Sequence, residues 1–244
     1  MMRPYQGDTP NKLISRHLVW SQHQRVLGEQ AFKAEPHMFL ASQYAGDVQH
    51  LRQMGVDNDN IWAVEMEESQ YRPILDKGKL EHRLFCRPVE CVVENKQLPL
   101  CRSIYLDFCG TLPGHIKPLR RVARQMSPGG ALSVCALHGR ERNGFRQVDR
   151  EAWLYDLLRE HCPHKVTLVQ EVRYWSKSDT KAGAPMRVWT FSIGNAGVGR
   201  AKMRFDLGLC CETPAELLWQ EALTRANNRS QAAVKANANR VHPV

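Results

Sequence analysis

The stretch SIYLDFCGT, residues 103–111, decides how the rest of the chain is interpreted. Its apolar residues predict a strand over 103–108, with Asp107 near the strand's end. A carboxylate that ends an apolar strand needs a partner or a function, because burying an unpaired charge is costly. Residues 116–126 then follow as a predicted helix, and the turn SPGG leads into a second apolar strand at 131–137.

The same alternation extends toward the N-terminus. Apolar runs predict three further strands, at 37–41, 61–65 and 82–86. Helical patterns separate the strands, at 47–54, 69–77 and 89–95. Upstream of all of them, residues 11–34 are predicted as one helix that ends before Pro36. Five strands that alternate with helices predict a mostly parallel sheet with helices on both faces.

Toward the C-terminus the pattern changes. A helix is predicted at 149–161, then two strands at 165–174 and 187–193 that only a polar loop joins, so we expect an antiparallel pair at one edge. A last helix is predicted at 214–226. The chain therefore divides into a helical lead-in (1–36), an α/β domain (37–194), a C-terminal helical extension (195–226) and a loose basic tail (227–244).

This order of elements resembles the class I S-adenosylmethionine-dependent methyltransferase domain. Local sequence supports the resemblance in three places: Glu65 at the end of the second strand, YLDFCGT at 105–111, and MSPGGAL at 126–132. The resemblance implies a Rossmann-like α/β fold, with a mostly parallel seven-stranded sheet, an antiparallel edge strand and helices on both faces. It also implies S-adenosylmethionine as the cofactor.

The resemblance assigns roles to individual residues. The catalytic set that it implies is Asp107, Phe108 and Cys109, and the cofactor-binding set is Ser42, Tyr44, Gly46, Glu65, Met66 and Glu90. Purely structural roles stay open for the acids: Asp107 could cap the next helix, Glu65 could lead a helix, and Glu90 could be a first-turn acid.

One stretch departs from the family. After the first strand the family has a glycine-rich turn that lets the backbone approach the cofactor, whereas LASQYAGD at 40–47 keeps only Gly46. The fold could therefore serve as a scaffold without a cofactor. The same stretch lacks G-x-G-x-x-G, which argues against a nicotinamide enzyme, and the absence of a phosphate loop argues against an NTPase.

Charge points to an acidic partner. The chain has a net charge of +9, and residues 115–194 hold 14 basic and 7 acidic groups, whereas residues 37–114 hold 8 and 11. Nucleic acid is the simplest polyanion, although a solvated basic face is the alternative. The predicted nucleic-acid-binding residues are Arg120, Arg124, Arg140, Arg142, Arg146, Lys177 and Lys181. The aromatic residues considered for base stacking are Phe108, Phe145, Tyr174 and Trp175.

The eight cysteines predict neither a metal site nor a disulfide framework. Their spacing lacks the close pairs of zinc sites, and a start without an apolar leader predicts thiols in a reducing cytoplasm. No apolar run approaches the length of a membrane span, so we expect no membrane partner. Cys109 and Cys135 lie near the places where cytosine-C5 methyltransferases acting on RNA use cysteines, so covalent chemistry stays open beside simple packing.

The sequence therefore predicts an S-adenosylmethionine-dependent methyltransferase that acts on nucleic acid. The alternative is a non-catalytic nucleic-acid-binding or scaffold protein on the same fold that has lost cofactor binding.

Overall fold

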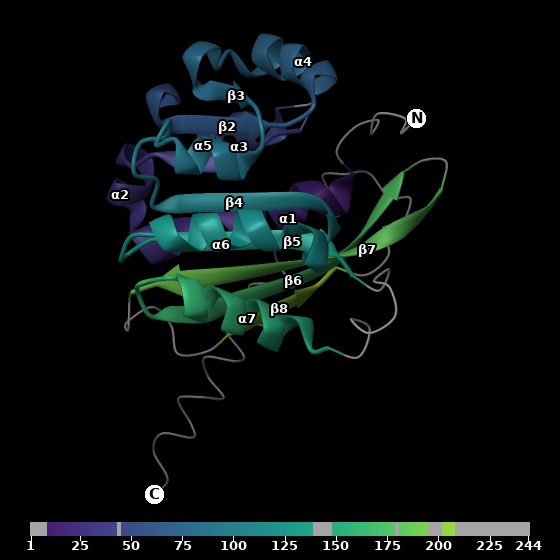
Figure 1. Cartoon of the computed structure of the whole chain (residues 1–244). Coiled ribbons are helices and arrows are strands. Elements are labelled where there is room, and N and C mark those ends of the chain that lie inside the picture. The colour runs from purple at the N-terminus through teal and green to yellow at the C-terminus, as the bar shows by residue number, and fades with distance from the viewer. Residues whose placement is uncertain (1–8, 43–44, 139–147, 179–180, 195–201, 208–244) are drawn as a thin grey trace, which may run out of the picture.

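One mixed sheet forms the centre of the structure (Figure 1). The computed structural model describes residues 9–42, 45–138, 148–178, 181–194 and 202–207. The strand order across the sheet is β3-β2-β1-β4-β5-β7-β6-β8. The strands are β1 (His37–Leu40), β2 (Ile61–Glu65), β3 (Leu84–Cys86), β4 (Ser103–Thr111), β5 (Ala131–Leu137), β6 (Val166–Ser178), β7 (Lys181–Ile193) and β8 (Met203–Asp206).

Parallel pairing dominates this sheet, as predicted. Only β7 runs against its neighbours, and it lies between β5 and β6 rather than at the edge. The short β8 pairs in parallel with β6 and forms the edge. The fold class is confirmed, but the sheet has eight strands among the described residues, not seven.

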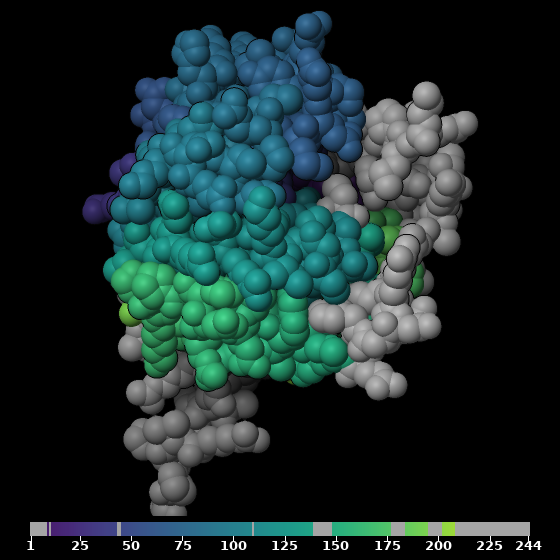
Figure 2. All heavy atoms as spheres, viewed as in Figure 1, coloured from purple at the N-terminus to yellow at the C-terminus, as the bar shows by residue number. Residues whose placement is uncertain are grey.

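Helices cover both faces of the sheet. In Figure 1, α5 (Val89–Glu94), α6 (Ile116–Gln125) and α7 (Arg150–His161) lie in front, and they form a continuous surface in the space-filling view of Figure 2. The apolar residues of α1 (Pro10–Leu27), α3 (Gly46–Gln53) and α4 (Glu68–Gly78) pack on the opposite face. Shorter elements complete the fold: α2 (Glu29–Ala34) and the 3-10 turns η1 (Asn58–Asn60), η2 (Glu81–Arg83) and η3 (Leu112–His115).

Strand alternation sorts the core into two clusters. In β4, Leu106 and Phe108 pack with α6, whereas Tyr105 packs with Trp20 of α1. Successive side chains of a strand point to opposite faces, so a continuously apolar strand can serve both clusters. Asp107 therefore has its place on the α1 face.

The N-terminal helix differs from the prediction. The expected single helix over 11–34 is two helices, because Gly28 has a φ of +83° and ends α1 with a backbone hydrogen bond to Gln24. Only glycine adopts this conformation readily. α2 then turns away, and α1 packs along the sheet against β5, β6 and β7.

The last predicted strands are longer than expected. The stretch predicted as a polar loop over 176–185 belongs mostly to β6 and β7, which continue to Ser178 and from Lys181. A further strand, β8, forms at residues 203–206, upstream of the predicted helix at 214–226. Residues 214–226 and the tail lie outside the described ranges. No helix in the described part of the chain is long and apolar enough to cross a membrane.

A series of hydrogen-bonded polar side chains lies buried between α1 and the sheet. His23 is fully buried, and its two ring nitrogens lie 2.8 Å from the hydroxyls of Ser103 and Ser133. Ser133 continues the chain to Thr190 at 2.7 Å. Burial lowers the pKa of His23 to about 3, and the charge of His37 acts in the same direction. This imidazole is therefore neutral at pH 7.

Candidate functional site

Two acidic side chains lie where β2, β1 and β4 reach the carboxyl edge of the sheet. In the strand register Leu40 pairs with Val64, and Phe39 pairs with Tyr105. Glu65 and Asp107 therefore lie at the same level, just beyond the end of β1. Two strand spacings, about 10 Å, separate their backbones. Ligands of open parallel sheets bind at this edge.

Asp107 has its partners on α1 and β5. Lys12 Nζ lies 3.1 Å from Asp107 Oδ2, and Cys135 donates a hydrogen bond to the same carboxylate. Burial by itself would raise the pKa of Asp107, but the charge of Lys12 and these hydrogen bonds outweigh it, so the pKa is lowered. The side chain is 12% exposed. It is therefore an ionised, nearly enclosed carboxylate.

A second buried ion pair lies beside the first. Arg16 Nε is 3.0 Å from Asp47 Oδ1, and the two side chains are 2% and 3% exposed. Trp20 Nε1 donates to the same oxygen at 2.9 Å. Burial raises the pKa of Asp47, although Arg16 and Trp20 oppose the shift. One helix, α1, thus supplies the cations for both carboxylates.

The predicted cofactor residues lie along the ends of β1 and β2. Glu65 is half-buried and accepts a hydrogen bond from the backbone N–H of Glu67 at 2.8 Å; burial raises its pKa. Met66 beside it is 66% exposed. Ser42 Oγ is buried without a hydrogen bond, and Gly46 begins α3. Tyr44 lies outside the described residues.

Phe108 is separated from Asp107. Its ring packs into the cluster on the α6 face and stacks on His115 at 4.0 Å between centroids. Gly110 makes this stack possible, since a Cβ there would come within 2.8 Å of His115 Nε2. Only 5% of Phe108 is exposed, so it does not offer a free face to a base. Nothing is described for the side chain of Cys109.

Glu90 lies in the first turn of α5, on the same side as His115. Its carboxylate is 3.7 Å from Lys117 Nζ at the start of α6. The structure thus brings Glu90 to the neighbourhood of the β4 carboxyl end, with an ion pair of its own.

Cys135 and Tyr174 take structural rather than reactive positions. Both are buried on the α1 face, with the sulfur 3.6 Å from the phenol oxygen. Burial and the neighbouring charge of Asp107 raise the pKa of the Cys135 thiol well above its ordinary value. A thiol that stays protonated is a poor nucleophile. The expectation that Tyr174 could stack on a base is wrong, because only 2% of it is exposed; Trp175 is 38% exposed.

The predicted basic residues are only partly placed. Arg120 and Arg124 are exposed on α6, which runs from the carboxyl edge toward the amino edge, so Arg124 lies about 12 Å along the helix axis from its start. Lys177 lies near the end of β6, and Lys181 begins β7. Three arginines, Arg140, Arg142 and Arg146, lie outside the described residues.

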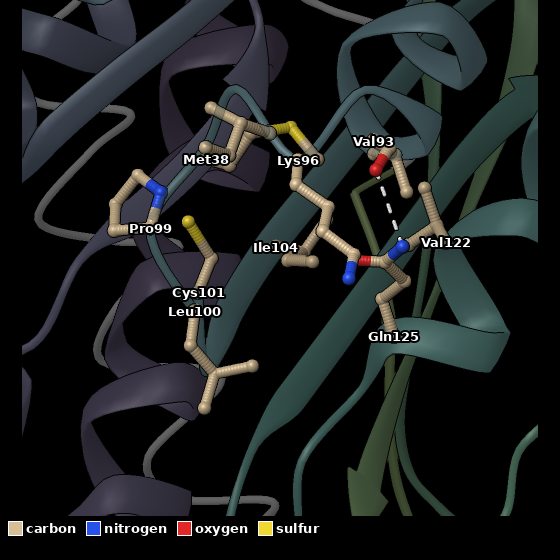
Figure 3. A pocket seen from close by; sticks show the side chains of 10 residues that line it. Met38, Val93, Lys96, Pro99, Leu100, Cys101, Ile104, Val122 and Gln125 are labelled. Atoms are coloured by element: carbon tan, nitrogen blue, oxygen red, sulfur yellow. Dashed lines mark hydrogen bonds between the residues drawn. The ribbon is translucent and has the colours of Figure 1, made fainter.

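A small pocket lies at the opposite, amino edge of the sheet. Its lining includes Met38, Cys101, Ile104, Lys96 and Gln125, which Figure 3 shows. Its volume of about 30 Å³ has room for one or two water molecules. The pocket is thus separate from the carboxylates of the carboxyl edge and too small for a nucleoside cofactor.

Sequence reasoning did not find Lys12, Arg16 or Asp47. The two cations are spaced four residues apart on a predicted helix, which places them on one face, but many solvated helices share that spacing. Only the packing of α1 on the sheet gives these residues their partners. No group of three or more candidate metal ligands occurs among the residues that the structure places.

Comparison with known proteins concerns the fold of the chain. No protein-family model and no curated protein matches the chain. A solved structure from Listeria monocytogenes, named as a candidate class I S-adenosylmethionine-dependent methyltransferase, has a TM-score of 0.57 and 11% identity, with 93% of this chain and 73% of that chain covered.

Two further solved structures are similar. The M protein of the type I restriction enzyme EcoKI has a TM-score of 0.53 and 14% identity, over 83% of this chain and 48% of that one. A candidate RNA methyltransferase from Pyrococcus horikoshii has a TM-score of 0.52 and 9% identity, over 80% of this chain and 93% of that one. At such identities the likeness concerns the fold. The chain has the Rossmann-like fold of class I S-adenosylmethionine-dependent methyltransferases.

Proposed function

We propose that this chain is an S-adenosylmethionine-dependent methyltransferase that acts on nucleic acid. The observation that carries the proposal is the placement of Glu65 and Asp107 at one level of the carboxyl edge, on either side of β1. In an open α/β sheet this is the position from which carboxylates reach a nucleoside ligand and the group that reacts with it.

The residues present fit this cofactor. Ser42 Oγ is a buried hydroxyl without a hydrogen bond at the end of β1, and such an orphaned group gains stability from a polar ligand. Glu65 would accept hydrogen bonds from ribose hydroxyls, and the exposed Met66 would cover an apolar ring. The proposed cofactor-binding residues also include Gly46, Glu90 and Tyr44.

The cofactor and the protein would contribute different parts of the reaction. S-adenosylmethionine, when bound, supplies the methyl group. Asp107 would hold the acceptor group of the target by a hydrogen bond and stabilise the positive charge that develops there. Lys12 keeps Asp107 ionised, and Cys135 fixes its orientation. Phe108 and Cys109 remain proposed neighbours of the site, with Phe108 acting through its stack on His115.

Nucleic acid is proposed as the substrate class on the basis of charge. The chain has 34 basic and 25 acidic residues, and the exposed Arg120 and Arg124 belong to the basic half. Two of the similar structures are named for a restriction enzyme and an RNA methyltransferase, which agrees with this class. Basic side chains near the edge would position phosphates without reading sequence. Lys177, Lys181, Arg140, Arg142 and Arg146 complete the proposed set.

Titration calorimetry with S-adenosylmethionine and S-adenosylhomocysteine, with NAD as the control ligand, tests the cofactor. We expect both sulfur ligands to bind and NAD not to bind. Glu65→Ala should weaken binding at least tenfold, whereas Glu68→Ala, an exposed acid on α4, should leave it unchanged. No heat and no thermal stabilisation with either sulfur ligand would overturn the proposal.

Transfer of a labelled methyl group to RNA and DNA pools tests the role of Asp107. Asp107→Asn keeps the shape but removes the charge, so we expect a loss of about 100-fold or more in turnover with cofactor binding retained. Lys12→Met should raise the pKa of Asp107 and move the acid limb of the pH profile upward, whereas Lys12→Arg should not. An Asp107→Asn variant with undiminished turnover would contradict the assigned role.

A second candidate function is nucleic-acid binding without catalysis. The observations that favour it are the loop after β1, where Gly46 is the one glycine of residues 40–47, and the ion pairs that already neutralise Asp107 and Asp47. Under this alternative the protein binds nucleic acid, S-adenosylmethionine gives no heat, and Asp107→Asn leaves nucleic-acid affinity unchanged.

A further inference from the structure

An unusual ion cluster lies on the β6–β8 side of the sheet, beside α7. At its centre is Glu171 of β6, whose side chain is 1% exposed. Arg173 Nε lies 2.9 Å from Glu171 Oε1, Lys202 Nζ lies 3.2 Å from Oε2, and Arg204 Nε lies 3.4 Å from Oε2. Arg187 also donates to Oε1. One buried carboxylate thus holds four cations.

The cluster has more positive than negative charge. Glu151 of α7 is its second carboxylate, paired with Lys202 and 3.6 Å from Arg187 Nη2. Four basic groups therefore share two carboxylates, and Asp206 at the end of β8 lies opposite Arg173 in the register. With Asp206 included, the net charge of the cluster is +1. Burial alone would raise the pKa of Glu171, but the hydrogen bonds from Arg187 and Arg173 lower it to about 2.

The cations differ in exposure, which separates two roles. Arg187 and Lys202 are 12% and 19% exposed, and they tie β7 and the β8 segment to Glu171. Arg173 and Arg204 are 52% and 68% exposed, so a large part of each faces solvent. Because Glu171 already orders these two guanidinium groups, they would lose little side-chain entropy on binding an anion.

The cluster has a defined position relative to the candidate site. Asp107 pairs with Cys135, Cys135 with Val188, and Arg187 follows one residue nearer the carboxyl edge. Arg173 pairs directly with Arg187. Arg173 is therefore level with Asp107 to within one residue, three strand spacings or about 14 Å across the sheet, and Arg204 lies one spacing farther. The cluster lies on the α7 face of the sheet, whereas Asp107 lies on the α1 face. A nucleic acid has a charged phosphate at every nucleotide, so a strand whose target base lies at Asp107 has neighbouring phosphates that can extend to the β6–β8 side.

We propose that Arg173 and Arg204 form a phosphate-binding surface on the β6–β8 side, which holds the backbone of a nucleic acid on the α7 face while its target base reaches the candidate site around the carboxyl edge. This inference rests on the proposed nucleic-acid substrate. Arg187, Lys202 and Glu171 position the two exposed guanidinium groups. The surface contacts phosphate and does not read bases, so it contributes affinity and salt dependence rather than sequence preference.

Fluorescence anisotropy of labelled RNA and DNA oligonucleotides over a series of salt concentrations tests the proposal. The double variant Arg173→Gln/Arg204→Gln should reduce the slope of log affinity against log salt by about 1.5, which is the loss of two phosphate contacts. Arg173→Lys/Arg204→Lys should restore most of the slope. The matched control Arg72→Gln/Lys77→Gln removes two exposed charges from α4, far across the sheet, and should leave the slope unchanged.

The outcomes separate this inference from the proposed function. If wild-type protein binds the oligonucleotides and the double variant keeps the same slope, the surface is overturned while the nucleic-acid function stands. If wild-type protein shows no salt-dependent binding, both fall. If polyglutamate binds as tightly as the oligonucleotides and loses affinity in the same variant, the surface serves an acidic protein and the inference is overturned. Calorimetry with S-adenosylmethionine should be unaffected in every variant.

Discussion

Lowering the pH from 7 to 5 is expected to destabilise the protein by several kcal/mol. Three histidines are buried or nearly buried in a neutral state: the pKa of His23 is lowered to about 3, and the pKa values of His37 and His50 are lowered to about 4. Burial is the main cause in each case. His37 Nε2 donates to the carbonyl of Phe32 at 2.6 Å, and that bond does not offset the burial.

The free energy of unfolding falls with pH because the unfolded chain takes up more protons than the folded chain. In the unfolded chain these imidazoles take up a proton as the pH falls through about 6.5, whereas in the folded chain they stay neutral down to about pH 4. The unfolded state therefore binds more protons in this window. Well below pH 6.5 each histidine costs at most about 1.4 kcal/mol of stability per pH unit, so the three together cost at most about 4 kcal/mol per unit. Folded domains have only about 5–15 kcal/mol in total.

Urea unfolding followed by tryptophan fluorescence at pH 7, 6 and 5, at constant ionic strength, measures this effect. The free energy of unfolding should fall steeply with pH. His23→Gln should remove about one third of the pH dependence, since it deletes one of the three titrating groups. His82→Gln, on the exposed η2 turn, is the control and should leave the slope unchanged. A free energy of unfolding that is constant between pH 7 and 5 would be incompatible with neutral buried histidines.

Asp47→Ala is expected to cost about 3–5 kcal/mol, because it removes the counter-charge of a guanidinium that is only 2% exposed. Trp20 loses the acceptor of its indole N–H in the same variant. The pair as a whole is not a large source of stability, since burial raises the pKa of Asp47 in spite of Arg16. The cost arises because Asp47→Ala leaves the buried guanidinium of Arg16 without a counter-charge. Replacing both partners with apolar residues would not have this cost.

A double-mutant cycle checks this interpretation by urea unfolding at pH 7. Arg16→Met/Asp47→Leu should be much more stable than Asp47→Ala alone, because no buried charge is left without its partner. Asp156→Ala, in an ion pair on α7 whose side chains are both 69% exposed, should change stability by less than about 0.5 kcal/mol. Equal costs for Asp47→Ala and the double replacement would show that the pair is not coupled.

Much of the architecture was predictable from local pattern. The strands at 61–65 and 131–137 have the predicted bounds, because an apolar run between turn residues has few alternatives to a buried strand. The fold class followed from the alternation of such runs with helices, and similar solved structures confirm it. The long β6–β7 hairpin and β8 were missed because their ends are polar, and pairing rather than composition makes them strands.

The candidate site was predictable only in part. Glu65 ends β2, as the sequence predicts, whereas β4 continues past the predicted end at 108 to Thr111, so Asp107 lies in the middle of its strand. Its level just beyond the end of β1 comes from the strand register. That Phe108 points away from Asp107 follows from strand alternation. That Lys12 pairs with Asp107 across 95 residues depends on how α1 packs on the sheet. Residue order thus determined which side chains reach the carboxyl edge. The tertiary structure decided which of them are charged, buried or paired, because burial and ion pairing depend on distances between segments that the sequence does not contain.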